Sequence, residues 1–236
     1  MSRGTTFPRS NRSLAKSAES PTAPVIVIGL GRFGSSVAKS LVRLGHEVLA
    51  VDERADIVQK FAGEFTHVVA ADTTDTEALR QIGAEQFPRA VVGIGTDIEA
   101  SVLTVLGLSD LGVAEIWAKA ISGKHAAILE RVGATHVVRP EADMGMRVAH
   151  LVTGTMTDYI EFDDGFALAR TRTPQVACGK TLAESALRQK YGITVVGVKT
   201  RGEDFTYARP ETPIAQSDEL IVSGPTNKVE AFCALP

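Results

Sequence analysis

The stretch that most constrains this chain is residues 25–34, VIVIGLGRFG. Four apolar, mostly β-branched residues run into the pattern G-x-G-x-x-G, which is typical of a buried parallel strand followed by a tight turn into a helix. Gly29 allows the turn, Gly31 lets a phosphate approach the backbone, and Gly34 lets helix and strand pack closely. The helix N-terminus presents free N–H groups to an anion. The pattern predicts a nucleotide site; the alternative is a fold whose glycines serve packing alone.

The residues after the glycine loop support the nucleotide interpretation. Residues 35–44 have helical apolar spacing and end before Gly45, a suitable C-terminal cap. A second strand over residues 47–51 ends at Asp52, followed by Glu53. A carboxylate at this spacing can accept hydrogen bonds from both hydroxyls of a ribose.

Strand and helix patterns alternate as far as residue 138, with Asp97 as the expected cap of a helix over 98–108. This alternation predicts an α/β fold, a Rossmann-like doubly wound parallel sheet of six strands. Ligands of such sheets bind beyond the carboxyl ends of the strands. Further site residues are therefore expected there, namely Asp72, Thr73, Gly93, Ile94, Gly95 and Lys119.

The expected domains are a disordered tail (1–23), a nucleotide-binding domain (24–140), a connector (141–158) and a small α+β domain (159–236). Residues 142–156 predict one helix with a stripe of apolar side chains at Val148, Leu151, Val152 and Met156. That helix is either a core element of the first domain or a connector that packs against a second subunit. An Asp-Asp-Gly sequence at 163–165 predicts a hairpin turn.

Five side chains bear on which nucleotide binds. Arg32 lies inside the glycine loop, where it either binds additional phosphate charge, as in ATP or ADP, or is simply solvated. Asp52 disfavours NADP because its carboxylate would repel a 2′-phosphate, although Arg54 leaves some room for one. Asp72 either accepts from the adenine amine or caps the next helix. Lys119 is either a neighbour of the phosphates or an ordinary residue at a strand end.

Composition narrows the function classes. The net charge of −3 lacks the excess of positive charge that is typical of nucleic-acid-binding proteins. The two cysteines lie far apart in the sequence, so we expect a reducing compartment and no disulfide framework. No apolar run approaches the ~20 residues needed to span a bilayer, and residues 1–23 do not resemble a signal peptide. The five histidines form no partnered motif. We therefore expect no catalytic residues.

Several stretches together resemble the RCK (regulator of potassium conductance) proteins, the cytosolic subunits of Ktr-type and Trk-type potassium uptake systems. They are residues 27–34, 45–52, 71–74, 117–120 and 140–145. The resemblance implies binding of ATP and ADP, and in relatives NAD(H), without enzymatic activity. It also implies dimers joined through the connector helix, an octameric ring under a membrane potassium channel, and a cytoplasmic location at the inner face of the membrane.

The resemblance also assigns roles to single residues. Arg32 would reach the terminal phosphate, often of a neighbouring subunit's nucleotide, and Phe33 lies in the same loop. Glu141 would help to hold Mg²⁺ or a monovalent cation beside the phosphates, or would serve only as a charge at a helix N-terminus. Some relatives bind cyclic di-AMP at a second site, which here would involve Leu182, Ala183, Glu184 and Arg188. The small Ala183 weakens the contact expected with the base.

Two other functions stay open from the sequence. An NAD(H)-dependent oxidoreductase or redox sensor would use the same pocket, and a nucleotide-sensing scaffold would act without a channel. Arg32 and the missing catalytic set favour a regulatory subunit over an oxidoreductase, and the resemblance implies that such a subunit gates a potassium transporter by ATP/ADP exchange.

Overall fold

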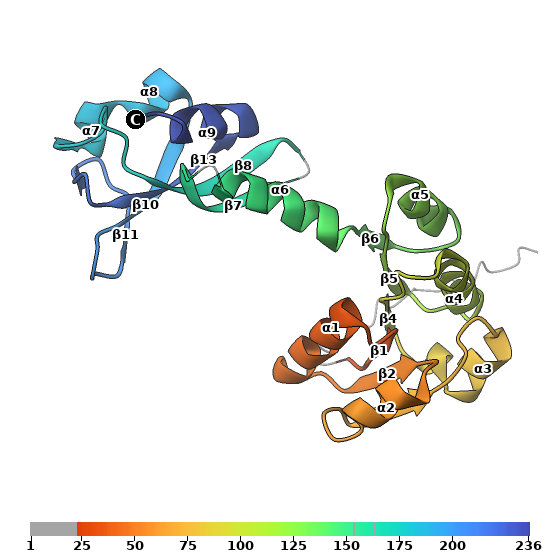
Figure 1. Ribbon diagram of the computed structural model, residues 1–236. Helices are drawn as coiled ribbons and strands as arrows, with labels where there is room; N and C mark the ends of the chain where they lie inside the picture. The colour runs from red at the N-terminus through yellow and green to blue at the C-terminus, as the bar shows by residue number, and fades with distance from the viewer. Residues whose placement is uncertain (1–22, 153, 163) are drawn as a thin grey trace, which may run out of the picture. The chain divides into compact units, whose positions relative to one another are not determined.

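The structure, a computed structural model, describes residues 23–152, 154–162 and 164–236. Most of the predicted tail, and Asp163 of the predicted hairpin turn, lie outside the described residues. The chain divides after Arg139 into two compact units, the second being Pro140–Pro236 (Figure 1). No helix within the described part combines the length and apolar character needed to cross a lipid bilayer.

The first unit is a parallel six-stranded sheet with strand order β3-β2-β1-β4-β5-β6. This confirms the predicted Rossmann-like doubly wound fold. Its strands are β1 (Val25–Ile28), β2 (Val48–Asp52), β3 (His67–Ala70), β4 (Arg89–Val92), β5 (Glu115–Lys119) and β6 (His136–Val138). Its helices are α1 (Arg32–Arg43), α2 (Ala55–Phe61), α3 (Thr76–Gln81), the short η1 (Ala84–Gln86), α4 (Ile98–Asp110) and α5 (Gly123–Arg131).

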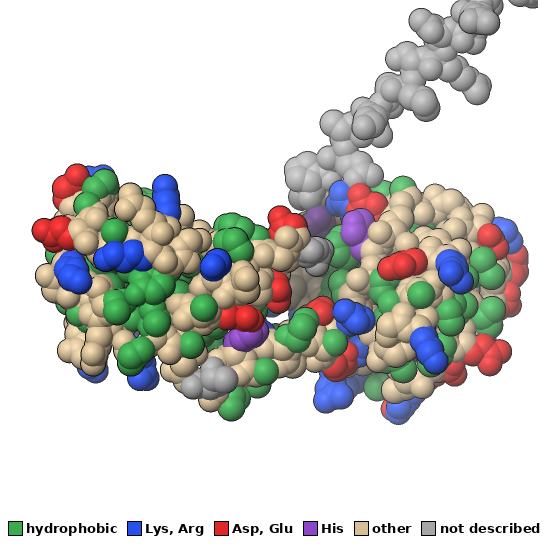
Figure 2. All heavy atoms as spheres, turned by 90° about the horizontal axis from the view of Figure 1, so that it is seen from above, with side chains coloured by type: hydrophobic (Ala, Val, Ile, Leu, Met, Phe, Trp, Pro, Cys, Tyr) green, Lys and Arg blue, Asp and Glu red, His purple; other side chains and the backbone are tan. Residues whose placement is uncertain are grey.

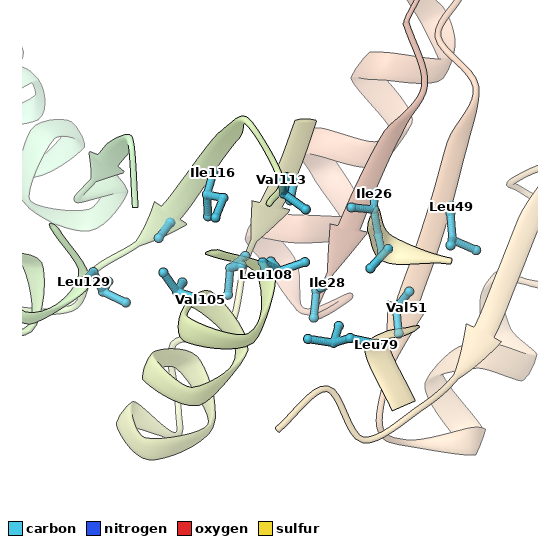
Figure 3. Close-up of a cluster of buried hydrophobic side chains, with 14 of the residues drawn as sticks. Ile26, Ile28, Leu49, Val51, Leu79, Val105, Leu108, Val113, Ile116 and Leu129 are labelled. Carbon is cyan, nitrogen blue, oxygen red and sulfur yellow. The ribbon is translucent and has the colours of Figure 1, made fainter. Parts of the chain in front are cut away.

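Helices cover both faces of this sheet, which explains the unbroken apolar run of β1. On one face, Ala38 of α1 and Phe61 of α2 pack against the strands. On the other, Leu79 of α3, Leu108 of α4 and Leu129 of α5 belong to a larger cluster, shown in Figure 3. The β1 side chains are buried between these two layers and hold the glycine loop on a rigid strand.

Local signals set most helix ends. The Gly45 N–H donates to Val42 O (3.0 Å) and the His46 N–H to Leu41 O (3.0 Å), so Gly45, with φ +87°, ends α1 as predicted. Asp97 caps α4 by accepting from the Ala100 N–H at 2.9 Å, also as predicted.

Two helix starts were left open by the sequence and are decided by the structure. The cap of α3 is Asp75, which accepts from the Glu77 N–H at 2.9 Å, so the helix-cap alternative for Asp72 fails. Helix α1 begins at Arg32 and not at residue 35, because its first hydrogen bond runs from the Ser35 N–H to Gly31 O at 3.0 Å.

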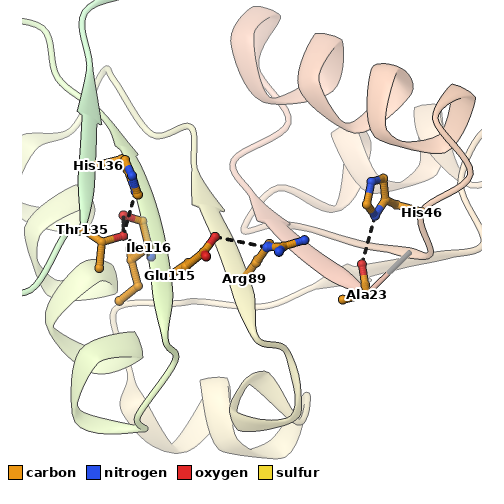
Figure 4. A network of polar contacts seen from close by, with 7 residues as sticks. All are labelled: Ala23, His46, Arg89, Glu115, Ile116, Thr135 and His136. Atoms are coloured by element: carbon orange, nitrogen blue, oxygen red, sulfur yellow. Dashed lines mark hydrogen bonds and ion pairs between the residues drawn. The ribbon is translucent and has the colours of Figure 1, made fainter. Parts of the chain in front are cut away.

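Polar contacts join the amino ends of the strands, at the edge of the sheet opposite the glycine loop (Figure 4). Arg89 at the start of β4 pairs with Glu115 at the start of β5, with Nε and Oε2 at 3.1 Å. His46 Nδ1 lies 3.0 Å from Ala23 O, and His136 Nδ1 lies 3.0 Å from Thr135 Oγ1. Both histidines therefore serve structure at this edge.

The second unit contains a five-stranded antiparallel sheet, order β11-β10-β13-β8-β7, and a small two-stranded sheet, β12-β9. This confirms the predicted small α+β domain. The elements are α6 (Pro140–Val152), β7 (Met156–Phe162), β8 (Phe166–Arg172), β9 (Lys180–Thr181), α7 (Leu182–Ser185), α8 (Leu187–Tyr191), β10 (Thr194–Lys199), β11 (Phe205–Tyr207), β12 (Pro213–Ile214), β13 (Glu219–Pro225) and α9 (Thr226–Cys233).

The predicted helix over 142–156 was wrong at its C-terminal end. Helix α6 ends at Val152, Gly154 has φ +74°, and Met156 begins β7. Met156 is buried in the core of the second unit, together with Leu220, Val222 and Phe232. Met156 is four residues after Val152, which is a helical spacing, but Met156 belongs to a strand because the helix ends before the turn at Gly154.

Candidate functional site

The glycine loop after β1 and the loop after β4 touch at the carboxyl edge of the sheet. A Cβ on Gly34 would lie 1.9 Å from the Gly29 carbonyl oxygen, and a Cβ on Gly93 would lie 2.9 Å from the same atom. Gly29 itself has φ +85° and lies against Ile94. These three glycines are required by packing and backbone geometry. They bring the two loops together where the strand order reverses, which is the usual ligand position in such sheets.

Gly31 differs from these glycines. Its φ of −63° and ψ of −171° suit any residue, and nothing lies within 4 Å of a Cβ built on it. Gly31 is the N-cap of α1, and no side chain caps this helix end. The chain therefore has no packing reason for a glycine here. The open space lies at an uncapped helix N-terminus, and the free N–H groups of such an end are suited to an anion.

Asp52 joins the end of β2 to the glycine loop. Its Oδ2 accepts from the Leu30 N–H at 2.7 Å and its Oδ1 from the Arg54 N–H at 3.0 Å. The residue is half-buried. Each carboxylate oxygen can accept a further hydrogen bond, so the group is fixed in place and still able to bind a diol.

The neighbours of Asp52 are exposed. Glu53 faces solvent. Arg54 donates to Asp56 through Nε (3.1 Å) and Nη2 (2.6 Å), and this contact raises the pKa of Arg54 and lowers that of Asp56. Its side chain is thus occupied by Asp56, which weakens the case for Arg54 as a partner of a 2′-phosphate.

Asp72 and Thr73 follow β3 and differ in orientation. Asp72 is exposed, and its Oδ1 accepts from the Thr74 hydroxyl (2.6 Å) and N–H (3.0 Å), which lowers the pKa of this carboxyl. It is therefore an ionised acceptor near the site. Thr73 is buried, with its Oγ1 2.8 Å from Thr104 Oγ1 of α4. Thr73 anchors the loop and can reach a ligand only through its backbone.

A cation lies beside the first turn of α1. Lys119, at the end of β5, has its Nζ 5.9 Å from the centre of the Phe33 ring. The same Nζ lies 3.2 Å from the position of a Cβ on Gly95. Arg32 is exposed, and we find no ion pair for it among the described residues. The structure thus places Lys119 beside Phe33 and Gly95, and Arg32 directly follows Gly31 in the loop.

The remaining predicted residues lie in the second unit. Glu141 is exposed in the first turn of α6. Leu182, Ala183 and Arg188 share a pocket of about 400 Å³. Glu184 does not line it, because its carboxylate accepts from the Thr181 N–H at 2.9 Å in a capping box that lowers its pKa. Within the described residues, no three His, Cys, Asp or Glu side chains come together as a metal site.

Sequence reasoning missed the contacts that shape the loop. The Leu30 N–H that binds Asp52 is a backbone group and has no signature in the sequence. Ser35 Oγ, which donates to Gly31 O at 2.7 Å, could have been found as a helical hydroxyl four residues after the cap.

Comparison with known proteins identifies the family. The TrkA-N domain matches residues 25–140 and the TrkA-C domain matches residues 172–236. Ktr system potassium uptake protein A of Bacillus subtilis (strain 168) is 36% identical over 207 residues, 87% of this chain and 93% of that protein. Protein C of the same organism is 39% identical over 87% of this chain and 94% of its own length.

The chain belongs to the Ktr potassium uptake protein family. This confirms the resemblance inferred from the motifs. Solved structures agree at the level of the fold for this family member. The GsuK RCK domain has a TM-score of 0.63 at 20% identity, covering 91% of this chain and 48% of that one. The GsuK channel bound to NAD has a TM-score of 0.61 at 20% identity, covering 89% and 38%.

Proposed function

We propose that this chain is a non-enzymatic regulatory subunit that gates a membrane potassium channel or transporter by binding a nucleotide at the glycine loop. The observation that carries the proposal is the open space at Gly31, in front of the uncapped N-terminus of α1. It occurs in a member of a family whose named relatives are potassium uptake proteins. The proposed ligand residues are Gly29, Gly31, Arg32, Phe33, Gly34, Asp52, Glu53, Asp72, the Thr73 backbone, Gly93, Ile94, Gly95 and Lys119.

The charges around the space favour an adenine nucleotide with two or three phosphates. Arg32 and Lys119 carry positive charge near the first turn of α1, and Asp52, fixed by the Leu30 N–H, would accept from the ribose hydroxyls. ATP and ADP fit this arrangement, and NAD(H) remains a second ligand because a solved channel of the same fold carries NAD. An NADP 2′-phosphate would meet the Asp52 carboxylate.

Two further ligands belong to the proposal. Glu141 would support a cation beside the ATP phosphates, either Mg²⁺ or a monovalent ion. The pocket at Leu182, Ala183 and Arg188 has a volume of about 400 Å³, within the range of small-molecule sites, and would take cyclic di-AMP. Glu184 would support that pocket only indirectly, through the cap of α7.

Assembly into a homo-oligomer is supported by α6. None of its residues is buried within its own unit, and Met144, Met146, Val148 and Val152 are 44–79% exposed. Figure 2 shows hydrophobic side chains among the charged ones on the surface of the chain. An apolar helix face that finds no cover in its own unit is typical of an interface. We propose that α6 joins two copies, that dimers build an octameric ring, and that the ring attaches to the channel at the cytoplasmic face of the membrane.

Calorimetry with ATP, ADP, NADH and NADPH tests the nucleotide part of the proposal. Asp52→Ala should weaken ATP, ADP and NADH alike, by roughly tenfold or more, because a charged hydrogen-bond pair to the ribose is lost. Asp56→Ala is the matched control, since it removes a neighbouring exposed carboxylate whose side-chain partner is Arg54. Unchanged affinity for all three ligands in Asp52→Ala would place the ribose elsewhere.

Potassium uptake in cells that make the chain with its channel tests gating. Arg32→Ala should abolish ATP-stimulated uptake while ADP binding largely survives, because gating by exchange needs an interaction that differs between the two nucleotides. Arg43→Ala, at the far end of α1, is the control. Full ATP-stimulated uptake by Arg32→Ala would remove this residue from the mechanism and return the oxidoreductase alternative to consideration.

A further inference from the structure

The second unit has a charged pocket at one end of its five-stranded sheet. None of the ligands proposed above binds there. Strand register places Arg172 of β8 opposite Glu219 of β13, and Glu219 opposite Lys199 of β10. Arg170 precedes Arg172 by two residues and therefore points to the same face of β8. The turn after β10 adds Arg201. Together with the 216–218 loop these side chains line a pocket of about 480 Å³.

The pocket is positive in a chain that is negative overall. Its lining holds four cations, Arg170, Arg172, Lys199 and Arg201, against two acids, Asp218 and Glu219, which leaves two positive charges. The whole chain carries a net charge of −3. Gathering uncompensated cations costs free energy through mutual repulsion, and a bound anion would relieve this cost.

The two acids make contacts within the chain. Glu219 pairs with Arg170, and Asp218 is 4% exposed with its Oδ2 accepting from the Ala215 N–H at 2.8 Å, while its buried Oδ1 has no hydrogen-bond partner among the described residues. Within the described residues, neither Arg172 nor Arg201 has an ion-pair partner. These two guanidinium groups are therefore available to an incoming anion.

Several contacts hold the pocket in shape. The Arg170 guanidinium and the Lys199 Nζ lie 5.5 and 5.6 Å from the centre of the Phe205 ring on β11. Lys199 also donates to the Glu203 carbonyl, which closes the turn that carries Arg201. Asp218, the last residue of the 216–218 loop, is held by Thr173. The Thr173 N–H and hydroxyl both donate to Asp218 O, at 3.2 and 2.9 Å. The buried Arg170 Nε has no hydrogen-bond acceptor, which a ligand oxygen would supply.

We propose that this pocket binds a phosphate group carrying two or more negative charges. Arginine is the side chain best suited to such a group, because its planar fork binds two oxygens at once. The pocket volume accommodates a phosphate-bearing small molecule. The same chemistry also fits the phosphomonoester headgroup of a lipid, and the two sources differ in whether the phosphate is free in solution or held in a bilayer.

The test uses the full-length protein, with pyrophosphate as the soluble probe and phosphatidylcholine vesicles with and without phosphatidic acid as the membrane probe. The variant is Arg172→Gln with Arg201→Gln, both exposed side chains whose loss should leave the fold intact. Arg43→Gln is the matched control, because it removes one exposed cation from the far end of α1 and leaves both this pocket and the glycine loop unchanged. Circular dichroism and thermal unfolding confirm that each variant is folded.

We expect calorimetry to show a pyrophosphate site that the double variant weakens by about tenfold or more and that Arg43→Gln leaves unchanged, whereas pyrophosphate bound at the glycine loop should persist in both variants. Alternatively, sedimentation of phosphatidic acid vesicles carries the wild-type chain down and the double variant far less, which supports the same pocket with a lipid source. If neither probe binds, or if the double variant binds both as the wild type does, the proposal is wrong.

Discussion

Replacing Gly31 by alanine should separate folding from nucleotide binding. The backbone at Gly31 suits any residue, and a Cβ there meets nothing within 4 Å. Alanine reduces the freedom of the unfolded chain, which stabilises a protein by about 0.4–1 kcal/mol. It is also a poorer N-cap than glycine, by roughly a similar amount. The free energy of unfolding should therefore change by no more than about 0.5 kcal/mol.

Binding should respond far more strongly to the same methyl group. In the proposed site, the Cβ of Gly31→Ala would take up open space at the uncapped N-terminus of α1 that we assign to a phosphate. Losing one charge-assisted hydrogen bond costs about 1.5–3 kcal/mol, which is about a ten- to 150-fold loss in affinity. Calorimetry with ADP and NADH, together with urea unfolding, measures both quantities on the same preparation.

Two other glycines provide matched controls. Gly63 follows α2, has open space around its Cβ position and lies away from the carboxyl edge, so Gly63→Ala should preserve binding. Gly34→Ala would place a Cβ 1.9 Å from Gly29 O and should lose about 1–3 kcal/mol of stability or more. If Gly31→Ala binds nucleotides as the wild type does, the space at Gly31 is not a phosphate site.

Two further predictions concern stability and assembly. Burial lowers the pKa of His125 below its ordinary value of about 6.5, so the unfolded chain binds this proton more readily and stability should fall as the pH drops below about 6.5. His125→Leu should make the free energy of unfolding, measured by urea unfolding, fall less steeply below that pH. The same pH dependence in the variant and the wild type would contradict this role of His125. Val148→Glu should split the oligomer in light scattering while the monomer stays folded, whereas Met156→Glu should unfold the second unit because it buries a charge. A Val148→Glu protein of unchanged mass would remove α6 from the interface.

Much of the fold could be predicted because its signals are local. The apolar run of β1, the glycines at 29 and 34, the cap at Asp97 and the end of α1 at Gly45 each depend on hydrogen bonds and sterics within a few residues. Local signals could not decide where two neighbouring residues were equally suitable for the same role. Asp72 and Asp75 are both suitable caps, and only the chain path decides that Asp75 accepts from Glu77 while Asp72 accepts from Thr74.

The sequence by itself determined the order of strands and helices and the residues that meet at the carboxyl edge, since parallel strands bring their ends together whatever their loops contain. Tertiary structure alone decided that Met156 leaves the helix for a strand, because burial among Leu220 and Phe232 is a long-range gain. It also decided the pocket at Arg172, Glu219 and Lys199. Arg172 and Glu219 are 47 residues apart in the chain and become neighbours only through the register of β8 and β13. No local sequence pattern encodes that pairing.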